Sequence, residues 1–171
     1  VAKIGVPPLI ATWMLQVAGR GVAELIGSGK ILTIYYKPFH YIGSGWLTGL
    51  PFSIFIVLTC GILMWLLVRK TALGLYLVST GSNKTVTRFA GINTQAVIWF
   101  AYILCGAMAG IAGIITTSEI KAADPVSLGL YLELDAILAC NIGGNSMKGG
   151  KLRLGGSILG ALLVQTLTTT I

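Results

Sequence analysis

The chain has 171 residues, of which 55% are hydrophobic and only 10% are charged, and its formal net charge is +7. Soluble domains usually carry about 25% charged residues, so this composition favours an integral membrane protein over a soluble enzyme. The basic residues lie scattered at the ends of apolar runs, where cytoplasmic loops collect them, and this argues against a nucleic-acid-binding surface.

Five apolar stretches follow one another along the chain. A spanning helix needs about 20 mostly apolar residues, so these stretches predict an all-α fold, a polytopic transmembrane helical bundle with four to five membrane segments. The expected spans are residues 6–26, 51–68, 96–117, 130–143 and 154–171. The fourth is too short to cross the hydrocarbon upright and alone. Because the chain begins at Val1 and stops inside an apolar run, we expect it to be a piece of a longer protein.

The loops between these spans differ in charge, and this difference predicts their side of the membrane. Cytoplasmic loops are enriched in lysine and arginine. The basic residues of the loops after the second and fourth spans are Arg69, Lys70, Lys84, Arg88, Lys148, Lys151 and Arg153. These two loops are therefore expected in the cytoplasm, and the loops at residues 27–50 and 118–129 are expected outside.

The cytoplasmic loop at residues 69–94 is too polar for a span, yet part of it has a helical pattern. Either Ser82 or Asn83 is suited to cap a short helix that runs to about Ala90, where Gly91 would end it. Such a helix gathers its apolar residues on one side, which suits insertion into a groove on a cytosolic protein. A helix resting on lipid headgroups is the alternative, and the pattern leaves both interpretations open.

Two carboxylates, Glu133 and Asp135, stand at the head of the fourth segment. They lie about 200° apart around a helix, so they do not form a paired catalytic site. Near a helix N-terminus a carboxylate accepts backbone N–H bonds and meets a favourable dipole. A contact with the translocation pathway or a binding protein, and a proton relay, remain the alternatives. Asn141, at membrane depth, would bond either a passing solute or a neighbouring helix.

The turn GGNSMKGGKLR after this segment is not a phosphate-binding loop. Such a loop ending at Lys151 would need glycine at Asn145 and a hydroxyl at Leu152, so ATP hydrolysis is expected on another chain. The lone His40 has no second ligand in the outer loop, which favours a solvated or interfacial histidine over a metal site. We expect no catalytic residue, no metal and no cofactor in this chain.

Small residues recur at helical spacing in two of the expected spans. Gly106 and Gly110 form one GxxxG pattern, and Gly156 and Gly160 form another. Small residues let helix backbones approach closely inside a membrane, which predicts tight packing, although membrane helices are also rich in glycine in general.

Two blocks of the sequence are similar to motifs of a known family. The run GLYLVSTGSNKTVTRFAGIN resembles the cytoplasmic signature loop of bacterial monosaccharide permeases, and LELDAILACNIGGNSMKGG resembles a later conserved block of the same family. The nearest resemblance is to permease subunits for ribose, galactose and especially galactofuranose. It covers nearly the whole chain, and full members are about twice as long, which implies the C-terminal half. The matching residues are Gly74, Gly81, Asn83, Gly91, Ile92, Asn93, Glu133, Leu134, Asp135, Ile137, Gly143, Gly144, Ser146, Gly149 and Gly150.

The resemblance implies one permease subunit of an ABC sugar importer in the bacterial inner membrane. Its implied partners are a separate ATPase that binds the ATP, a periplasmic sugar-binding protein, a second permease subunit and the lipid bilayer. The implied ATPase-coupling residues are Gly81, Ser82, Asn83, Lys84, Arg88, Phe89, Gly91, Ile92 and Asn93. The implied pathway or periplasmic residues are Glu133, Asp135 and Asn141, and the implied cytoplasmic turn contains Gly143, Gly144, Ser146, Gly149 and Gly150.

The family's usual pattern is not followed everywhere, and other functions remain open. Leu75 stands where the family has arginine, and Leu152 and Leu154 stand where glycine is frequent. A permease for branched-chain amino acids is the nearest alternative, because its late segment is similar to the second block. A passive channel or scaffold without an ATPase is the alternative from another class.

Overall fold

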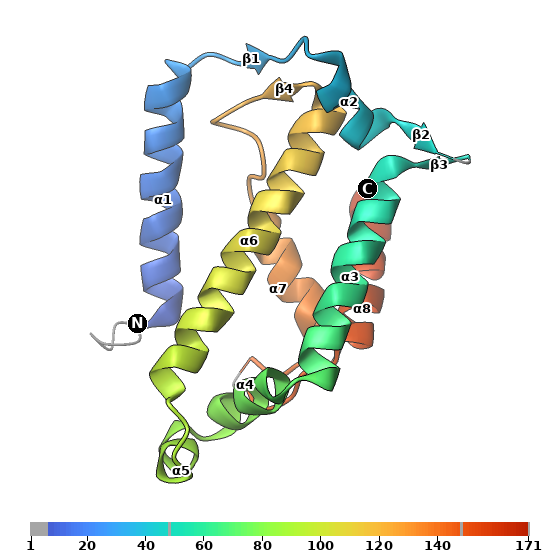
Figure 1. Ribbon diagram of the computed structural model, residues 1–171. Helices are drawn as coiled ribbons and strands as arrows, with labels where there is room; N and C mark the ends of the chain where they lie inside the picture. The colour runs from blue at the N-terminus through green and yellow to red at the C-terminus, as the bar shows by residue number, and fades with distance from the viewer. Residues whose placement is uncertain (1–6, 48, 148, 171) are drawn as a thin grey trace. The chain divides into compact units, whose positions relative to one another are not determined.

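The computed structural model describes residues 7–47, 49–147 and 149–170. Of the residues used in the sequence analysis, four lie outside the described residues: Val1, Val6 at the start of the first expected span, Lys148, and Ile171 at the end of the fifth. The chain is mostly helical (Figure 1). It divides into two compact units. Unit 1 contains residues Val1–Ile62 and Tyr102–Gly129, and unit 2 contains residues Leu63–Ala101 and Leu130–Ile171.

Unit 1 is built from helices and four very short strands. Its elements are α1 (Pro8–Gly27), β1 (Leu32–Thr33), α2 (Lys37–Ser44), β2 (Trp46–Leu47), β3 (Leu50–Pro51), the first part of α3 (Phe52–Lys70), the later part of α6 (Thr94–Ile120) and β4 (Ala122–Ala123). The strands form two antiparallel pairs, β1 with β4 and β2 with β3. The all-α prediction is therefore right for most of the chain and wrong for these four strands.

The loop expected at residues 27–50 is more ordered than its sequence indicates. It contains α2, which is anchored to α6 by the fully buried hydroxyl of Ser118. That hydroxyl accepts from the Gly43 N–H at 2.8 Å and donates to the Phe39 carbonyl at 2.5 Å. His40 is half-buried, and its Nε2 lies 2.6 Å from the Ile34 carbonyl oxygen. The His40 ring is thus held against the backbone and is not fully solvated, and the interfacial alternative stays a prediction.

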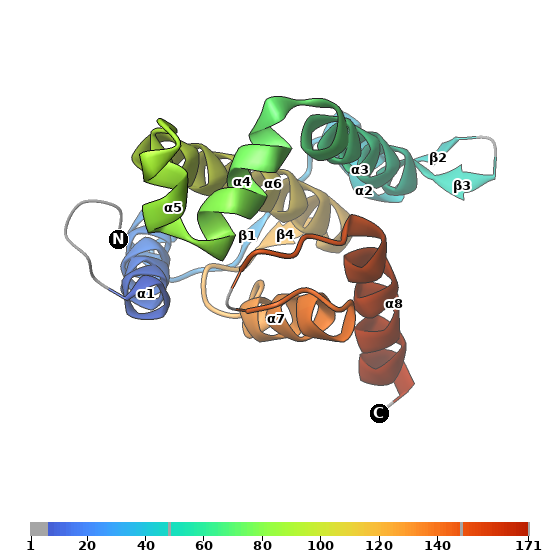
Figure 2. The same cartoon turned by 90° about the horizontal axis from the view of Figure 1, so that it is seen from below.

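Unit 2 contains the segments that carry most of the candidate functional residues. Its elements are the later part of α3, α4 (Ala72–Ser82), α5 (Lys84–Phe89), the first part of α6, α7 (Leu132–Ile142) and α8 (Leu154–Thr170). Figure 2 shows α7 and α8 side by side. A Cβ atom at Gly156 would lie 2.0 Å from the Gly143 carbonyl oxygen, and one at Gly160 would lie 2.0 Å from the Ala139 carbonyl oxygen. The predicted tight packing at Gly156 and Gly160 is confirmed.

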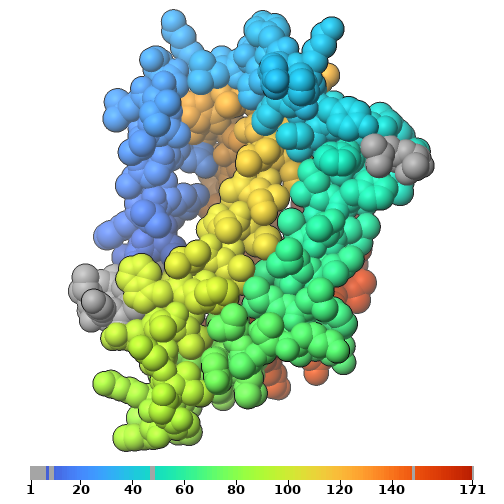
Figure 3. All heavy atoms as spheres, viewed as in Figure 1, coloured from blue at the N-terminus to red at the C-terminus, as the bar shows by residue number. Residues whose placement is uncertain are grey.

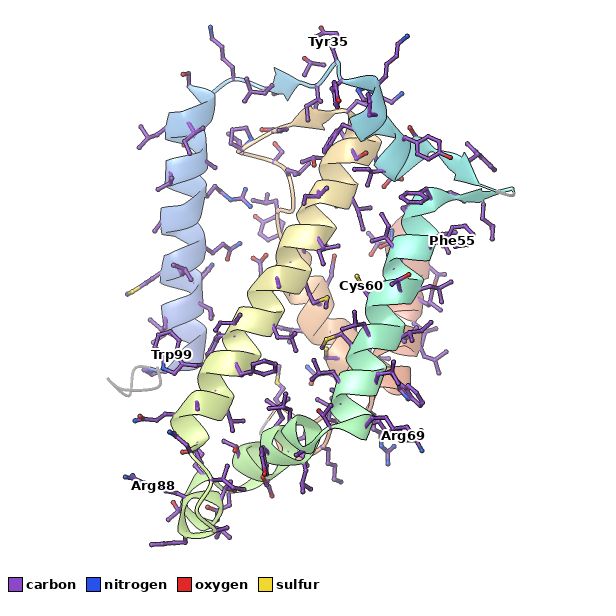
Figure 4. The ribbon with its side chains drawn as sticks, viewed as in Figure 1. Tyr35, Phe55, Cys60, Arg69, Arg88 and Trp99 are labelled. Atoms are coloured by element: carbon purple, nitrogen blue, oxygen red, sulfur yellow. The ribbon has the colours of Figure 1, made fainter. Side chains whose placement is uncertain are left out.

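Two helices, α3 and α6, are long and apolar enough to cross a membrane, with mean hydropathies of 2.2 and 2.1 in their best windows. Neither window is buried inside the chain, which distinguishes these helices from the core helices of soluble proteins. α3 ends in Arg69 and Lys70, and the Arg69 guanidinium lies 5.5 Å from the centre of the Trp65 ring (Figure 4). An aromatic ring and basic residues at a helix end are typical of a membrane interface.

The other expected spans are helical, and their crossing of the membrane stays a prediction. α7 has 11 residues and is about 16 Å long at 1.5 Å per residue, well short of the roughly 30 Å hydrocarbon thickness. The short length predicted for this segment is therefore confirmed. The glycines of the α6 pattern, Gly106 and Gly110, meet no atom within 4 Å among the described residues, so their packing role stays a prediction.

Candidate functional site

Asn83 joins two helices of the predicted coupling loop. Its backbone is extended, and its N–H donates to the Ser79 carbonyl at 3.0 Å, which ends α4. Its side-chain oxygen accepts from the N–H groups of Thr85 at 3.0 Å and Val86 at 3.2 Å, which begins α5. A side-chain oxygen at this position satisfies N–H groups that the first helical turn leaves unpaired. The prediction that a cap at this point starts a short helix is confirmed, and Asn83 rather than Ser82 provides it.

The C-terminal end of α5 is closed by the predicted glycine. Gly91 has a φ of +81°, a conformation that a residue with a side chain rarely adopts. Its N–H donates to the Arg88 carbonyl at 3.0 Å, and the Ile92 N–H donates to the Thr87 carbonyl at 3.3 Å. These two bonds form a Schellman motif. The Asn93 side chain then accepts from the Ala96 N–H at 3.2 Å and caps the start of α6.

The apolar side chains of α5 are exposed. Val86 is 63% exposed and Phe89 is 87% exposed, whereas Thr87 is only 4% exposed and donates its hydroxyl to the Asn83 carbonyl at 2.9 Å. Lys84 and Arg88 are also exposed, and Arg88 extends away from the neighbouring helices (Figure 4). Figure 3 shows the yellow-green side chains of α5 standing clear on the face in view. We call Lys84, Val86, Arg88 and Phe89 the α5 surface.

An apolar groove of about 480 Å³ lies next to the α5 surface in unit 2. It lies between α4 and the beginning of α6, and three predicted coupling residues, Gly91, Ile92 and Asn93, contribute to its wall. The other lining residues are Leu73, Tyr76, Ala96, Val97 and Phe100. The loop thus presents both protruding apolar side chains and a concave apolar surface, the two shapes used in helix-in-groove recognition.

The acids at the head of α7 lie in its first turn, as predicted. Glu133 and Asp135 are half-buried there, where the helix dipole favours negative charge. The N-cap residue, however, is Tyr131 in a left-handed conformation, and no side chain caps this end. The expected position of the acids in the favourable dipole of the first turn is therefore confirmed, but neither acid is the N-cap residue. Asn141 is exposed in the last turn of α7, far along the helix from the acids.

Asn145 is a structural residue of the glycine-rich turn that sequence reasoning missed. Its Oδ1 accepts from the Arg153 N–H at 2.6 Å, and its Nδ2 donates to the Ser157 hydroxyl at 2.7 Å. The side chain therefore ties the end of α7 to the first turn of α8. The signal available in the sequence was an amide residue next to two glycines at a helix end, which is a frequent capping context.

The structure places the predicted coupling loop in contact with the predicted cytoplasmic turn. Gly81 of the coupling loop lies against Gly149 and Gly150 of the turn between α7 and α8, backbone to backbone. Gly149 and Gly150 have φ values of +85° and +83°. Gly144 also has a positive φ, +79°, but meets no atom within 4 Å. The glycines of the turn therefore differ in role: some only shape it, and two make the contact.

In unit 1, the loop after β4 is fixed by an aspartate and an arginine. The Asp124 carboxylate accepts from the Val126 N–H at 2.9 Å, and this bond is the main cause that lowers the pKa of Asp124 below its ordinary value. The Arg20 guanidinium of α1 donates to the Val126 carbonyl and adds a smaller lowering of the same pKa by its charge.

Comparison with known proteins gives a consistent assignment. The family model described as the permease component of the branched-chain amino acid transport system matches residues 1–171. The galactofuranose transporter permease protein of Escherichia coli is 46% identical over 100% of this chain and 50% of its own length. The fructose import permease protein of Bifidobacterium longum is 35% identical over 100% of this chain and 49% of its own length.

The ribose import permease protein of Haemophilus influenzae is 33% identical over 96% of this chain and 52% of its own length. The chain thus spans about half the length of the curated relatives it matches. No solved structure matches the chain. With the family model matched along the entire sequence, the chain belongs to the family of branched-chain amino acid transport system permease components, whose members include these sugar permeases.

Proposed function

We propose that this chain is part of the permease subunit of an ATP-driven monosaccharide importer in the bacterial inner membrane. In this proposal it lines the translocation pathway together with a second permease subunit, identical or different. A separate ABC ATPase binds and hydrolyses ATP, so the chain itself needs no cofactor, and a periplasmic sugar-binding protein delivers the substrate. The sugar relatives named above support a monosaccharide, with galactofuranose first because that relative has the highest identity among them.

The observation that carries this proposal is the α5 surface. A six-residue helix with Phe89 87% exposed and Val86 63% exposed is poorly placed to stabilise its own fold. Its caps at Asn83 and Gly91 nevertheless hold it in one conformation. An exposed aromatic residue beside Arg88, next to an apolar groove, has the composition of a protein-docking site.

Removal of Phe89 tests the docking role. The full-length permease is co-expressed with its ATPase subunit, and the complex is purified through a tag on the permease. Burying a phenylalanine side chain contributes about 1.5–3 kcal/mol, so Phe89→Ala should weaken ATPase retention roughly 10- to 100-fold. Tyr35→Ala is the matched control, because Tyr35 is 86% exposed and lies in the loop expected on the opposite side. Equal retention in both variants would contradict the docking role and favour a helix resting on lipid.

Uptake measurements test the substrate class. Cells that express the whole importer should accumulate radiolabelled galactofuranose, ribose or fructose, and accumulation should stop when ATP is depleted. Leucine uptake without sugar uptake would favour the branched-chain amino acid alternative, which the description of the matched family keeps open. Uptake that persists without ATP would favour a passive channel.

The acids of α7 and Asn141 are proposed to act on the pathway or at the periplasmic face. Glu133 and Asp135 lie at the opposite end of α7 from the turn that contacts the coupling loop. If that turn is cytoplasmic, the acids lie toward the outer side, where a delivered sugar or its binding protein would meet them. Glu133→Gln and Asp135→Asn should then alter uptake while leaving ATPase retention unchanged.

A further inference from the structure

The end of α4 and the turn before α8 approach each other closely at Gly81, Ser82, Gly149 and Gly150. A Cβ atom at Gly149 would lie 2.6 Å from the Gly81 carbonyl oxygen, and one at Gly81 would lie 3.0 Å from the Gly150 nitrogen. A Cβ atom at Gly150 would lie 3.2 Å from the Ser82 Cα. Real Cβ atoms essentially never approach other atoms within 3.0 Å, so the two backbones are in direct contact. The Ser82 side chain also borders this contact, with its Cβ 3.3 Å and its hydroxyl oxygen 3.4 Å from a Cβ built on Gly150.

On one side, this contact is connected rigidly to the α5 surface. Only Ser82 separates Gly81 from Asn83, and Asn83 both ends α4 and caps α5. The neighbouring Thr80 is 4% exposed, whereas Gly81 and Ser82 at the end of α4 are exposed. A force applied to α5 therefore reaches Gly81 through hydrogen-bonded backbone rather than through a loose linker.

On the other side, the contact is connected to α7 and α8. The Gly149 N–H donates to the Ser146 carbonyl at 3.0 Å, which closes the turn. Asn145 of the same turn is bonded to Arg153 and to Ser157 in the first turn of α8. α8 packs closely on α7 through its small residues. α7, the turn and α8 thus form one packed hairpin, and this hairpin carries the candidate pathway residues.

We propose that Gly81, Gly149 and Gly150 are positioning residues that form a joint between the α5 surface and the α7–α8 hairpin. This inference rests on the proposed function, because it assigns the joint to the transmission of ATPase motion. Closely packed interiors transmit displacement, and a contact between two hydrogen-bonded backbones moves both elements together. Displacement of α5 by the ATPase is thereby converted into movement of the hairpin, at the end opposite to Glu133 and Asp135.

Gly149→Ala tests the joint in the complete importer, reconstituted in proteoliposomes with its ATPase and binding protein. The added methyl group would displace the turn from Gly81, while the α5 surface stays intact. ATPase co-purification should be normal, and the ratio of sugar transported to ATP hydrolysed should fall roughly 2- to 30-fold, the range of measured coupling effects. The matched control is Gly49→Ala, because Gly49 has a φ of +87° but meets no atom within 4 Å. An equal ratio in both variants would overturn the joint.

A cross-link provides the second test, which does not depend on whether Gly149→Ala folds. The Ser82 Cβ lies 3.3 Å from a Cβ built on Gly150, close to the roughly 3.5–4.5 Å of disulfides. In an active background without Cys60, Cys105 and Cys140, the reduced Ser82→Cys, Gly150→Cys variant is the reference, and oxidation should leave the transport ratio of that variant unchanged. Transport that is blocked by oxidation and restored by reductant would show that the two elements must separate, which overturns the joint.

These outcomes are distinct from failure of the proposed function. An unmodified permease that neither retains an ATPase nor transports sugar would refute the importer assignment itself, and the joint with it. A functional importer in which Gly149→Ala transports with the unmodified ratio would refute the joint alone.

Discussion

The bonds of Asn145 predict a measurable loss of stability when its side chain is removed. Its two strong contacts, to the Arg153 N–H at 2.6 Å and to the Ser157 hydroxyl at 2.7 Å, each contribute about 0.5–1.5 kcal/mol net. Asn145→Ala should therefore lower the free energy of unfolding by about 1–3 kcal/mol. Ser157→Ala removes only one of the two bonds, and a double-mutant cycle between the two residues should return a coupling of about 1 kcal/mol.

Unfolding of the full-length permease in mixed micelles, titrated with SDS and followed by tryptophan fluorescence, measures this loss. Asn141→Ala is the control, because Asn141 is an exposed amide in the last turn of α7. It should change the free energy of unfolding by less than about 0.5 kcal/mol, as surface substitutions usually do. The reasoning fails if Asn145→Ala unfolds like the unmodified protein, or if both asparagine variants lose the same stability.

Three further predictions follow from other contacts. Gly160→Ala should lower the SDS fraction at which the permease unfolds, because the added Cβ would lie 2.0 Å from a carbonyl oxygen of α7. Gly110→Ala should leave that fraction unchanged, because a Cβ there meets no atom within 4 Å among the described residues. Thr80→Val should be neutral or stabilising in the same titration, because the buried Thr80 hydroxyl has no hydrogen-bond partner in the described structure. The lowered pKa of Asp124 means that its bond to the Val126 N–H stabilises the loop above the ordinary aspartate pKa and is lost as the pH falls through the lowered one. Proteolysis of this loop should increase in that acidic range, and Asp124→Ala should abolish the pH dependence.

The features that sequence reasoning predicted well depend on local interactions. The start of α5 at Asn83 and its end at Gly91 follow from backbone geometry within a few residues, and such rules apply in any fold. The amphipathic pattern also indicated which residues share a side of α5. It did not indicate that Thr87 is buried and Phe89 exposed, because the direction in which a helix turns its faces depends on the rest of the chain.

The features that sequence reasoning missed depend on contacts between distant residues. α2 has a single turn of apolar pattern, and its position depends on Ser118, 75 residues beyond Gly43. Glu133 and Asp135 were placed correctly in the first turn of α7, but the left-handed Tyr131 that begins the helix has no clear sequence signal. The contact of Gly81 with Gly149 was similarly hidden, since each glycine alone is explained by its own turn or helix.

The two GxxxG patterns show why a motif predicts a capacity for packing rather than a contact. In α8, Gly156 and Gly160 meet carbonyl oxygens of α7, and a methyl group at either position would collide with backbone. In α6, Gly106 and Gly110 have the same spacing and meet no atom within 4 Å among the described residues. Small residues allow two helices to approach closely, but the fold must also place a second helix against them. The turn held by Asn145 supplies this second helix for α8 by folding α7 back onto the glycines.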